Sequence, residues 1–264
     1  MRLSAEEAGE QRTVSDRLLM IIDAIANSPG EVGLSELVRL TGLKKATAHR
    51  LAADLVAHRM LERGAYGYRL GLRLFELGQH VPASRRLRNC ARPFMADLVT
   101  ATGETVHLGV LDGTDVLCIE KLTGRRTAAA ATSIGSWLPA YCTGLGKVLL
   151  AFSHESAAAP TLAEPMTGHT GTTITDPTQF LRELARIRDA GVAYDREEWL
   201  PGVVCVAAPI VVESYVGRDG HRAVAALSVT GPAGRLQTAR VASAVRTADA
   251  DHQPQPGPAA AAVN

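Results

Sequence analysis

Apolar positions in the first part of the chain recur every three or four residues, which is the spacing of one face of an α-helix. The first run predicts a helix whose apolar face consists of Val14, Leu18, Ile21, Ile22 and Ile25. The segment NSPGEVG at 27–33 then ends the pattern. A second, shorter helix is expected to begin with Ser35 as its N-cap and to end at Gly42. The chain therefore opens with two helices joined by a loop.

A third helix is predicted over about 45–58, with one face made of Ala48, Leu51 and Leu55. The segment MLERGAYGYRLG at 60–71 alternates aromatic and apolar residues around two glycines, which is typical of a small β-hairpin. Two helices joined by a tight turn and followed by a hairpin predict a winged helix-turn-helix.

The distribution of charge supports a DNA-binding role for this winged helix-turn-helix. The whole chain has a net charge of +1, yet 39–73 holds eight Lys or Arg against two acidic residues, a local excess of +6. Such a cluster attracts phosphates, although a solvated basic helix face is the simpler alternative. The residues expected to contact DNA from the helices and the wing are Ser35, Lys44, Lys45, Thr47, His49, Arg50, Arg63, Tyr66, Tyr68 and Arg69.

Beyond the wing, apolar spacing predicts a linker helix over 72–79, and VPAS at 81–84 interrupts it before a second amphipathic run. Short strands are then expected at 104–110 and 115–121, with Asp112-Gly113 forming the turn between them. Further strands are expected at 203–210 and 223–229, and helices are expected at 146–152 and near the C-terminus. This mixture predicts a second domain of the α+β class.

One further helix carries signals at both ends. Asp176 is expected to cap it, Pro177 to occupy its first position and Gly191 to end it. Its inner face is expected to consist of Phe180, Leu181, Leu184 and Ile187.

Length and composition place these elements in two domains, because 264 residues with 46% hydrophobic content exceed the needs of one compact domain. The expected division is a flexible leader at 1–12, a DNA-binding domain at 13–71, a linker helix at 72–83, a second domain at 84–249 and a disordered tail at 250–264. There is no run of eighteen apolar residues, so a cytoplasmic protein is expected. Four widely spaced cysteines predict reduced thiols, and neither a metal nor a cofactor is expected.

Several segments together resemble the isocitrate lyase regulator (IclR) family of bacterial transcription factors over residues 14 to about 245. These segments are GLKKATAHRL, YGYRLG, GETVHL, TGLGKVLLA, TTIT, GVAYDREE, GVVCVAAPI and ALSVTGP. The resemblance implies a winged-helix domain, a linker helix and an effector-binding domain similar to the GAF and profilin-like folds. It also implies a homodimer, or a dimer of dimers, on a near-palindromic DNA operator. Members of the family respond to small metabolites, often organic or aromatic acids, and act as repressors, activators or both.

The resemblance also implies an effector pocket lined by Ala130, Leu138, Gly144, Leu145, Asp195, Val203, Cys205, Ser228 and Thr230. Apolar walls with a few convergent polar groups suit a small ligand. The backbone N–H groups of Gly144, Leu145 and Gly146 could receive a carboxylate, whereas Asp195 would repel one unless it is protonated or pairs with a ligand hydroxyl. The alanine-rich segment AAAATS at 128–133 suggests a pocket roomier than a two- or three-carbon acid needs.

Other interpretations compete with this one. A hydrolase could use Cys205 with His107 and Asp195, but no sequence signature places a nucleophile beside a base, and packing is the simpler role for Cys205. A dimerisation module with incidental basic charge would show no salt-sensitive affinity for DNA. Lys147 is expected to be structural or to pair with a carboxylate, because GLGK lacks the remaining residues of a phosphate loop. Core packing is the default for Trp137 and Trp199, although both could flank the site.

Overall fold

The computed structural model describes residues 12–125, 132–211 and 222–250. The expected leader, apart from residue 12, lies outside this part of the chain, as do Ala130 and residues 251–264 of the expected tail. The chain divides into two compact units, Met1–Arg85 and Arg86–Asn264.

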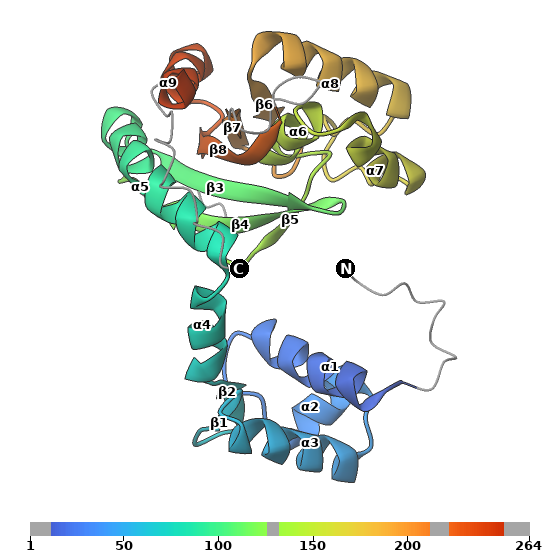
Figure 1. Cartoon of the computed structure of the whole chain (residues 1–264). Coiled ribbons are helices and arrows are strands. Elements are labelled where there is room, and N and C mark those ends of the chain that lie inside the picture. The colour runs from blue at the N-terminus through green and yellow to red at the C-terminus, as the bar shows by residue number, and fades with distance from the viewer. Residues whose placement is uncertain (1–11, 126–131, 212–221, 251–264) are drawn as a thin grey trace, which may run out of the picture. The chain divides into compact units, whose positions relative to one another are not determined.

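The N-terminal unit is a winged helix-turn-helix (Figure 1). Its elements are α1 (Val14–Ala26), α2 (Leu34–Thr41), α3 (Lys45–Ala57), β1 (Leu61–Arg63), β2 (Tyr68–Leu70) and α4 (Leu72–Gln79). Strands β1 and β2 are antiparallel, and Tyr68 also forms an isolated bridge with Val32. This bridge attaches the wing to the loop between α1 and α2.

Local signals explain where these helices begin and end. Thr13 and Asp16 form a capping box at the start of α1, in which each side chain accepts a hydrogen bond from the other residue's backbone N–H. Gly42 adopts a left-handed conformation, with φ of 67°, and ends α2 as predicted. Apolar side chains of the three helices and the wing then share one core, which includes Ile21, Leu37, Leu51 and Leu61.

Two expectations for this unit are wrong. Ser35 is not the N-cap of α2, because Gly33 caps the helix and its carbonyl accepts the N–H of Leu37. Ser35 lies exposed in the first turn instead. Tyr68 cannot lie along DNA as expected, since its side chain is buried in the core of the unit.

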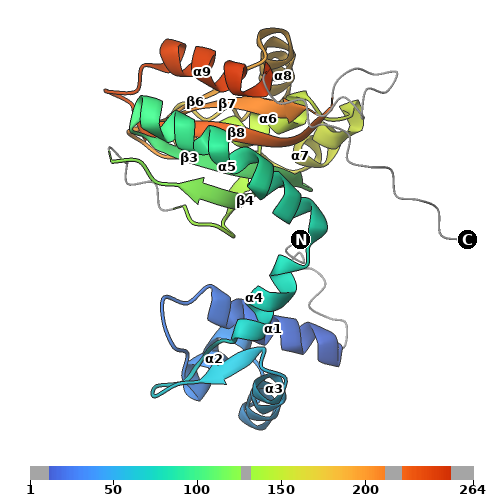
Figure 2. The ribbon, with the colours of Figure 1, turned by 60° about the vertical axis from the view of Figure 1, so that its left-hand side comes forward.

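The C-terminal unit is built around one six-stranded antiparallel sheet in the order β5-β4-β3-β8-β7-β6 (Figures 1 and 2). Its strands are β3 (Thr105–Asp112), β4 (Asp115–Leu122), β5 (Trp137–Pro139), β6 (Ala193–Arg196), β7 (Val203–Val211) and β8 (Ala223–Pro232). Its helices are α5 (Pro82–Thr102), α6 (Gly144–Ala151), the 3₁₀ helix η2 (Glu155–Ala158), α7 (Ala159–Ala163), α8 (Pro177–Ala190) and α9 (Thr238–Ala250).

Helices cover both faces of this sheet, as Figure 2 shows. Alternation along β7 explains the two layers, because Val206 points to one face and Ala207 to the other. On the Val206 face, α5 and α9 complete a core that includes Met95. On the Ala207 face, α6 and α8 pack against the sheet through residues such as Phe180. The unit is therefore a three-layered α+β domain, in agreement with the expected class.

The ends of α8 follow the prediction, but its inner face does so only in part. Asp176 accepts a hydrogen bond from the N–H of Gln179, and Gly191 ends the helix in a left-handed conformation. Leu181 is 49% exposed, so its predicted place in the core is wrong. The turn between β3 and β4 is shifted by one residue, because Asp112 pairs with Asp115 and leaves Gly113 and Thr114 as the loop.

Candidate nucleic-acid interface and ligand cavity

The exposed face of α3 carries the cations of the predicted DNA contact. Ala48, Leu51, Ala52 and Leu55 bury the opposite face of this helix. Lys44 caps the helix, and Lys44, Lys45, His49 and Arg50 are exposed while Thr47 is half-buried. Within the described residues, Lys44, Lys45 and Arg50 form no ion pair, so their charge is available to a phosphate or a base edge.

The wing presents fewer uncompensated charges. Tyr66 is 88% exposed at its tip, and its backbone N–H donates to Glu31 Oε2 over 2.7 Å. Arg69 pairs with Glu62 at 3.0 Å and lies 3.9 Å from Glu31. Arg63 stacks over the ring of Tyr68 at 5.9 Å from its centroid. Glu31 therefore holds the tip of the wing, while part of the charge of Arg69 is neutralised within the unit.

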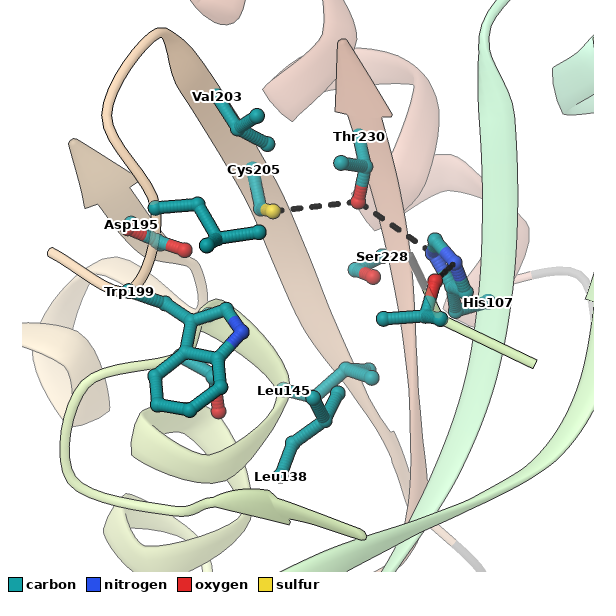
Figure 3. A pocket seen from close by; sticks show the side chains of 13 residues that line it. His107, Leu138, Leu145, Asp195, Trp199, Val203, Cys205, Ser228 and Thr230 are labelled. Atoms are coloured by element: carbon teal, nitrogen blue, oxygen red, sulfur yellow. Dashed lines mark hydrogen bonds between the residues drawn. The ribbon is translucent and has the colours of Figure 1, made fainter. Parts of the chain in front are cut away.

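The second candidate site is a cavity on the sheet face that α6 covers (Figure 3). Strand register assembles its polar groups from distant segments. Asp195, Cys205 and Thr230 occupy one row across β6, β7 and β8, and Ser228 pairs with His107 of β3 in the next row. Residues that sit opposite one another in a sheet share a face, so these five side chains face the same space.

Eight of the nine expected pocket residues line this cavity, and the ninth, Ala130, lies outside the described residues. The eight are Leu138, Gly144, Leu145, Asp195, Val203, Cys205, Ser228 and Thr230. The space free of protein atoms between these side chains is about 450 Å³, a figure that includes open solvent at the cavity's mouth. The remaining lining residues are His107, Thr132, Thr143, Trp199 and Leu200.

Some of these could have been found from the sequence. His107 alternates with apolar neighbours in a predicted strand, and only its orientation was open. Trp199 flanks the cavity rather than packing in the core, and Trp137, also expected in the core, is 49% exposed on β5.

A chain of hydrogen bonds crosses the cavity wall through His107. Its Nε2 lies 2.9 Å from Thr132 Oγ1, and its Nδ1 lies 3.3 Å from Thr230 Oγ1. Burial, helped by the charge of Lys121, lowers the pKa of His107 to about 4. The imidazole is therefore neutral at physiological pH and adds no positive charge to the cavity.

Cys205 lies beside Thr230 rather than beside the histidine. Its Sγ is 3.1 Å from Thr230 Oγ1, which stands between the thiol and His107. Burial and the nearby Asp195 carboxylate raise the pKa of Cys205 well above the usual value. A nucleophilic cysteine needs the opposite shift and a base in direct contact, so this arrangement does not favour a thiolate nucleophile.

Asp195 is the acidic group of the cavity wall. Its Oδ1 accepts the backbone N–H of Glu198 over 2.8 Å, and the side chain is 3% exposed. Burial is the main cause that raises the pKa of Asp195 to about 6, with a smaller contribution from the charge of Glu198. The carboxyl group therefore changes charge close to physiological pH.

The N-terminus of α6 opens onto the same cavity. Thr143 caps the helix and accepts the N–H of Gly146 over 3.2 Å, so Gly146 does not donate to a ligand as expected. Gly144 and Leu145, in contrast, line the cavity. A Cβ on Gly146 would lie 2.2 Å from Ala140 Cα, which explains why this turn requires glycine there.

Lys147 is buried one turn into α6 and pairs with carboxylates, as predicted. It is 0% exposed, donates to Glu198 Oε1 and lies 3.8 Å from Glu183 Oε1. Glu198 Oε2 is buried and has no hydrogen-bond partner among the described residues. This cluster lies behind the cavity, because Glu198 is also the residue whose N–H binds Asp195.

The described ranges lack two further kinds of feature. None of the helices there is both long enough and apolar enough to cross a bilayer. Nor do three or more His, Cys, Asp or Glu side chains of these ranges gather into a potential metal site.

A winged helix-turn-helix with an exposed basic face, joined to an α+β domain with a cavity, defines a DNA-binding protein of the transcription-regulator class. Comparison with known families agrees. Residues 15–65 match the IclR helix-turn-helix domain, and residues 79–251 match the C-terminal domain of bacterial IclR transcriptional regulators. The chain belongs to the IclR family.

The individual relatives are transcriptional regulators, and the match covers most of the length of both chains. The chain is 35% identical to the HTH-type transcriptional regulator XynR of Escherichia coli over 235 residues, covering 86% of this chain and 89% of that protein. It is 30% identical to the transcriptional repressor IclR of Escherichia coli over 244 residues, covering 90% and 86% of the two chains. A crystal structure of an IclR homologue complexed with 4-hydroxybenzoate, from Microbacterium hydrocarbonoxydans, superposes with a TM-score of 0.81 at 27% identity, covering 89% of this chain and 95% of that one.

Proposed function

We propose that this regulator binds a near-palindromic operator through α3 and its wing, and that a small organic or aromatic acid in the cavity controls its operator affinity. The observation that carries the proposal is the cavity itself. It gathers eight residues expected from the family resemblance between one sheet face and the N-terminus of α6.

On the DNA side, Arg50 and His49 would reach base edges in the major groove, while Lys44 and Lys45 would contact phosphates. The exposed positions of all four support these roles. Ser35 and Thr47 would add hydroxyl contacts to phosphates, and Arg63, Tyr66 and Arg69 would contact the backbone beside the wing. Phosphate contacts make the affinity fall steeply with salt, which separates this function from that of a dimerisation module with incidental charge.

On the effector side, the N–H groups of Gly144 and Leu145 would receive a carboxylate at the positive end of α6. Asp195, Ser228 and Thr230 would bind hydroxyl groups of the same molecule. The IclR homologue complexed with 4-hydroxybenzoate supports an acid of about the size of that ligand. We infer no catalytic role for Cys205, and the alternative of a cysteine hydrolase is not favoured, since the relatives named above are regulators.

A symmetric dimer would present two copies of α3 to two half-sites. The apolar side chains that α4 leaves exposed support such an assembly, since Leu72 is 69% and Phe75 67% exposed. Association of two dimers would extend the same symmetry. An effector can alter DNA binding only by favouring one arrangement of this dimer, and typical couplings are about 1 to 3 kcal/mol.

Two measurements test the function. Selection from a randomised duplex library should recover an inverted repeat whose affinity falls steeply with salt, and recovery of no preferred sequence would contradict the DNA-binding role. A thermal-shift screen of organic and aromatic acids should find a stabilising ligand, and the double variant Asp195→Ala, Ser228→Ala should lose that response but keep its DNA affinity. Full retention of the response would remove these residues from the site.

A further inference from the structure

The charges around the cavity do not suit a simple anion site. Of its described lining residues, none is Lys or Arg, and His107 is neutral because burial holds its pKa near 4. Asp195 is the acidic side chain among them. A ligand carboxylate at the N-terminus of α6 would therefore enter a cavity that already holds a negative charge.

The two negative groups would also be close together. A Cβ on Gly144, the first residue of α6, would lie 3.8 Å from Asp195 N and 3.5 Å from Cys205 Cβ. The helix terminus that could attract a carboxylate thus sits against the strand that carries Asp195. Like charges that are brought close together inside a buried site cannot both remain ionised without a large cost.

Among the described residues, no nearby cation is free to neutralise Asp195. Lys147 on α6 is the cation that faces it, but its ammonium group already pairs with Glu198 and lies near Glu183 on α8. Glu183 also pairs with Arg186, so Lys147 is the cation left for Asp195 and Glu198 together, and one oxygen of Glu198 is buried without a hydrogen bond among the described residues. A ligand anion would add a further negative charge.

The other described titratable groups around Asp195 do not supply a positive charge either. Cys205 on β7 and Cys142 before α6 both have a pKa raised by burial, so both are neutral thiols. Arg196 follows Asp195 on β6, but its guanidinium stacks on the Tyr194 ring, 4.6 Å from the centroid. Adjacent residues of a strand point to opposite faces, so Arg196 is on the other side of the sheet.

We propose that an acidic effector enters this cavity together with one proton from the solvent, which the Asp195 carboxylate takes up. No bond within the effector changes. The protonated carboxyl group then donates a hydrogen bond to the effector instead of repelling it. The inference rests on the proposed effector site and adds that its occupancy, and hence its control of DNA binding, strengthens as the pH falls from 8 to 6.

The pKa of Asp195, raised to about 6 before any ligand arrives, supports this coupling. Most of the population is ionised at pH 7 to 8, and a second anion would shift the balance toward the protonated form. Linkage then makes anion affinity about 10- to 50-fold weaker at pH 8 than at pH 6. Asp195→Asn removes the charge and keeps a hydrogen-bond donor, so it should bind the acid equally well at both pH values.

Calorimetric titration of the full-length protein tests the proposal with acetate, lactate, benzoate and 4-hydroxybenzoate as probes. An ordinary carboxyl group is ionised throughout this pH range, so these probes do not change charge. For an acid that binds, titrations at pH 7 in buffers of different ionisation enthalpy should show uptake of nearly one proton per site in the wild type and almost none in Asp195→Asn. The neutral analogue 4-hydroxybenzamide is the matched control and should bind the wild type without proton uptake.

Each other outcome has a distinct meaning. Acid binding with neither proton uptake nor pH dependence would overturn the inference and leave the proposed effector site intact. Equal proton uptake by Asp195→Asn would assign the proton to another group and would also overturn it. Failure of every acid to bind either protein at pH 6 and at pH 8 would instead remove the acid-effector function itself.

Discussion

Lys147 and Glu198, which are 51 positions apart in the sequence, form an ion pair inside the C-terminal unit. Lys147 is 0% exposed and Glu198 is 5% exposed, so neither charge has adequate access to water. Burying two such charges costs several kcal/mol each, and their attraction offsets that cost only while both partners are present. The pair therefore fixes the end of β6, where Asp195 lies, against α6.

Removing one partner of the Lys147–Glu198 pair should strongly destabilise the protein. Lys147→Met is expected to lower the free energy of unfolding by about 3 to 5 kcal/mol, because it leaves Glu198 charged and unpaired in the interior. Urea unfolding at pH 7.5 measures the change. The matched control is Arg73→Met, which breaks an exposed pair with Glu76 and should cost less than about 1 kcal/mol. Equal losses in the two variants would show that the buried pair has no special role.

Asp195 and His107 should give stability opposite dependences on pH. The pKa of Asp195 is raised to about 6 in the folded protein, so folding favours its protonated form, and this contribution is lost as the pH rises from about 4 to 6. The pKa of His107 is lowered to about 4, so folding favours the neutral ring, and that contribution is lost as the pH falls from 6.5 to 4. Each effect changes the free energy of unfolding by on the order of 3 kcal/mol, and the two effects oppose each other between about pH 4 and pH 6.

Single variants separate the two effects. Asp195→Asn should become steeply less stable as the pH falls from 6.5 to 4.5, because Asp195 then no longer opposes the effect of His107. His107→Gln should show the reverse and gain stability relative to the wild type over the same range. Chemical unfolding at four or five pH values measures both. Parallel stability curves for all three proteins would contradict the assigned pKa directions.

Arg50 tests the DNA-binding face of α3. Because the side chain is exposed and forms no ion pair with the described residues, Arg50→Ala should leave the thermal melting temperature within about 2 °C of the wild type. Operator affinity should fall by about 10- to 100-fold if the guanidinium reads a base edge. Arg182→Ala, an exposed arginine on α8, removes the same charge from the other unit and should change affinity little. Equal effects of the two variants would mean that only net charge matters.

Substitutions of Glu31 test whether its contact with the wing matters for DNA binding. Its carboxylate accepts the N–H of Tyr66, and Gly64 packs so closely that a Cβ there would lie 1.8 Å from Glu31 Oε1. Glu31→Gln keeps an acceptor and removes a charge, whereas Glu31→Ala removes both. The Ala variant should bind the operator about 3- to 10-fold more weakly than the Gln variant, since one hydrogen bond that orders the wing is worth about 1 kcal/mol. Fluorescence anisotropy measures both, and equal affinities would exclude a role for this contact.

Short-range chemistry made much of the fold predictable. Gly42 and Gly191 end helices because a left-handed residue is needed there, and Asp176 caps α8 through a bond three residues away. These signals lie within one turn of the structure they determine. Ser35 was misjudged because Gly33, which has no capping side chain, took the N-cap position two residues earlier.

The cavity was predictable only through the family resemblance, because its row of Asp195, Cys205 and Thr230 depends on the register of three strands. No local pattern specifies that register or brings Trp199 to the cavity. The partner of Lys147 could not be identified from the sequence either. A lysine in an apolar helix predicts that some carboxylate pairs with it, but not which one. The three-residue strand β5 is too short to produce a readable alternation.

The most direct test of the account is the operator affinity of the full-length protein, measured by fluorescence anisotropy with and without a saturating acid that binds the cavity. The account predicts a change of about 5- to 150-fold in the wild type and almost none in the double variant Asp195→Ala, Ser228→Ala. An operator affinity that the bound acid leaves unchanged in the wild type would contradict it.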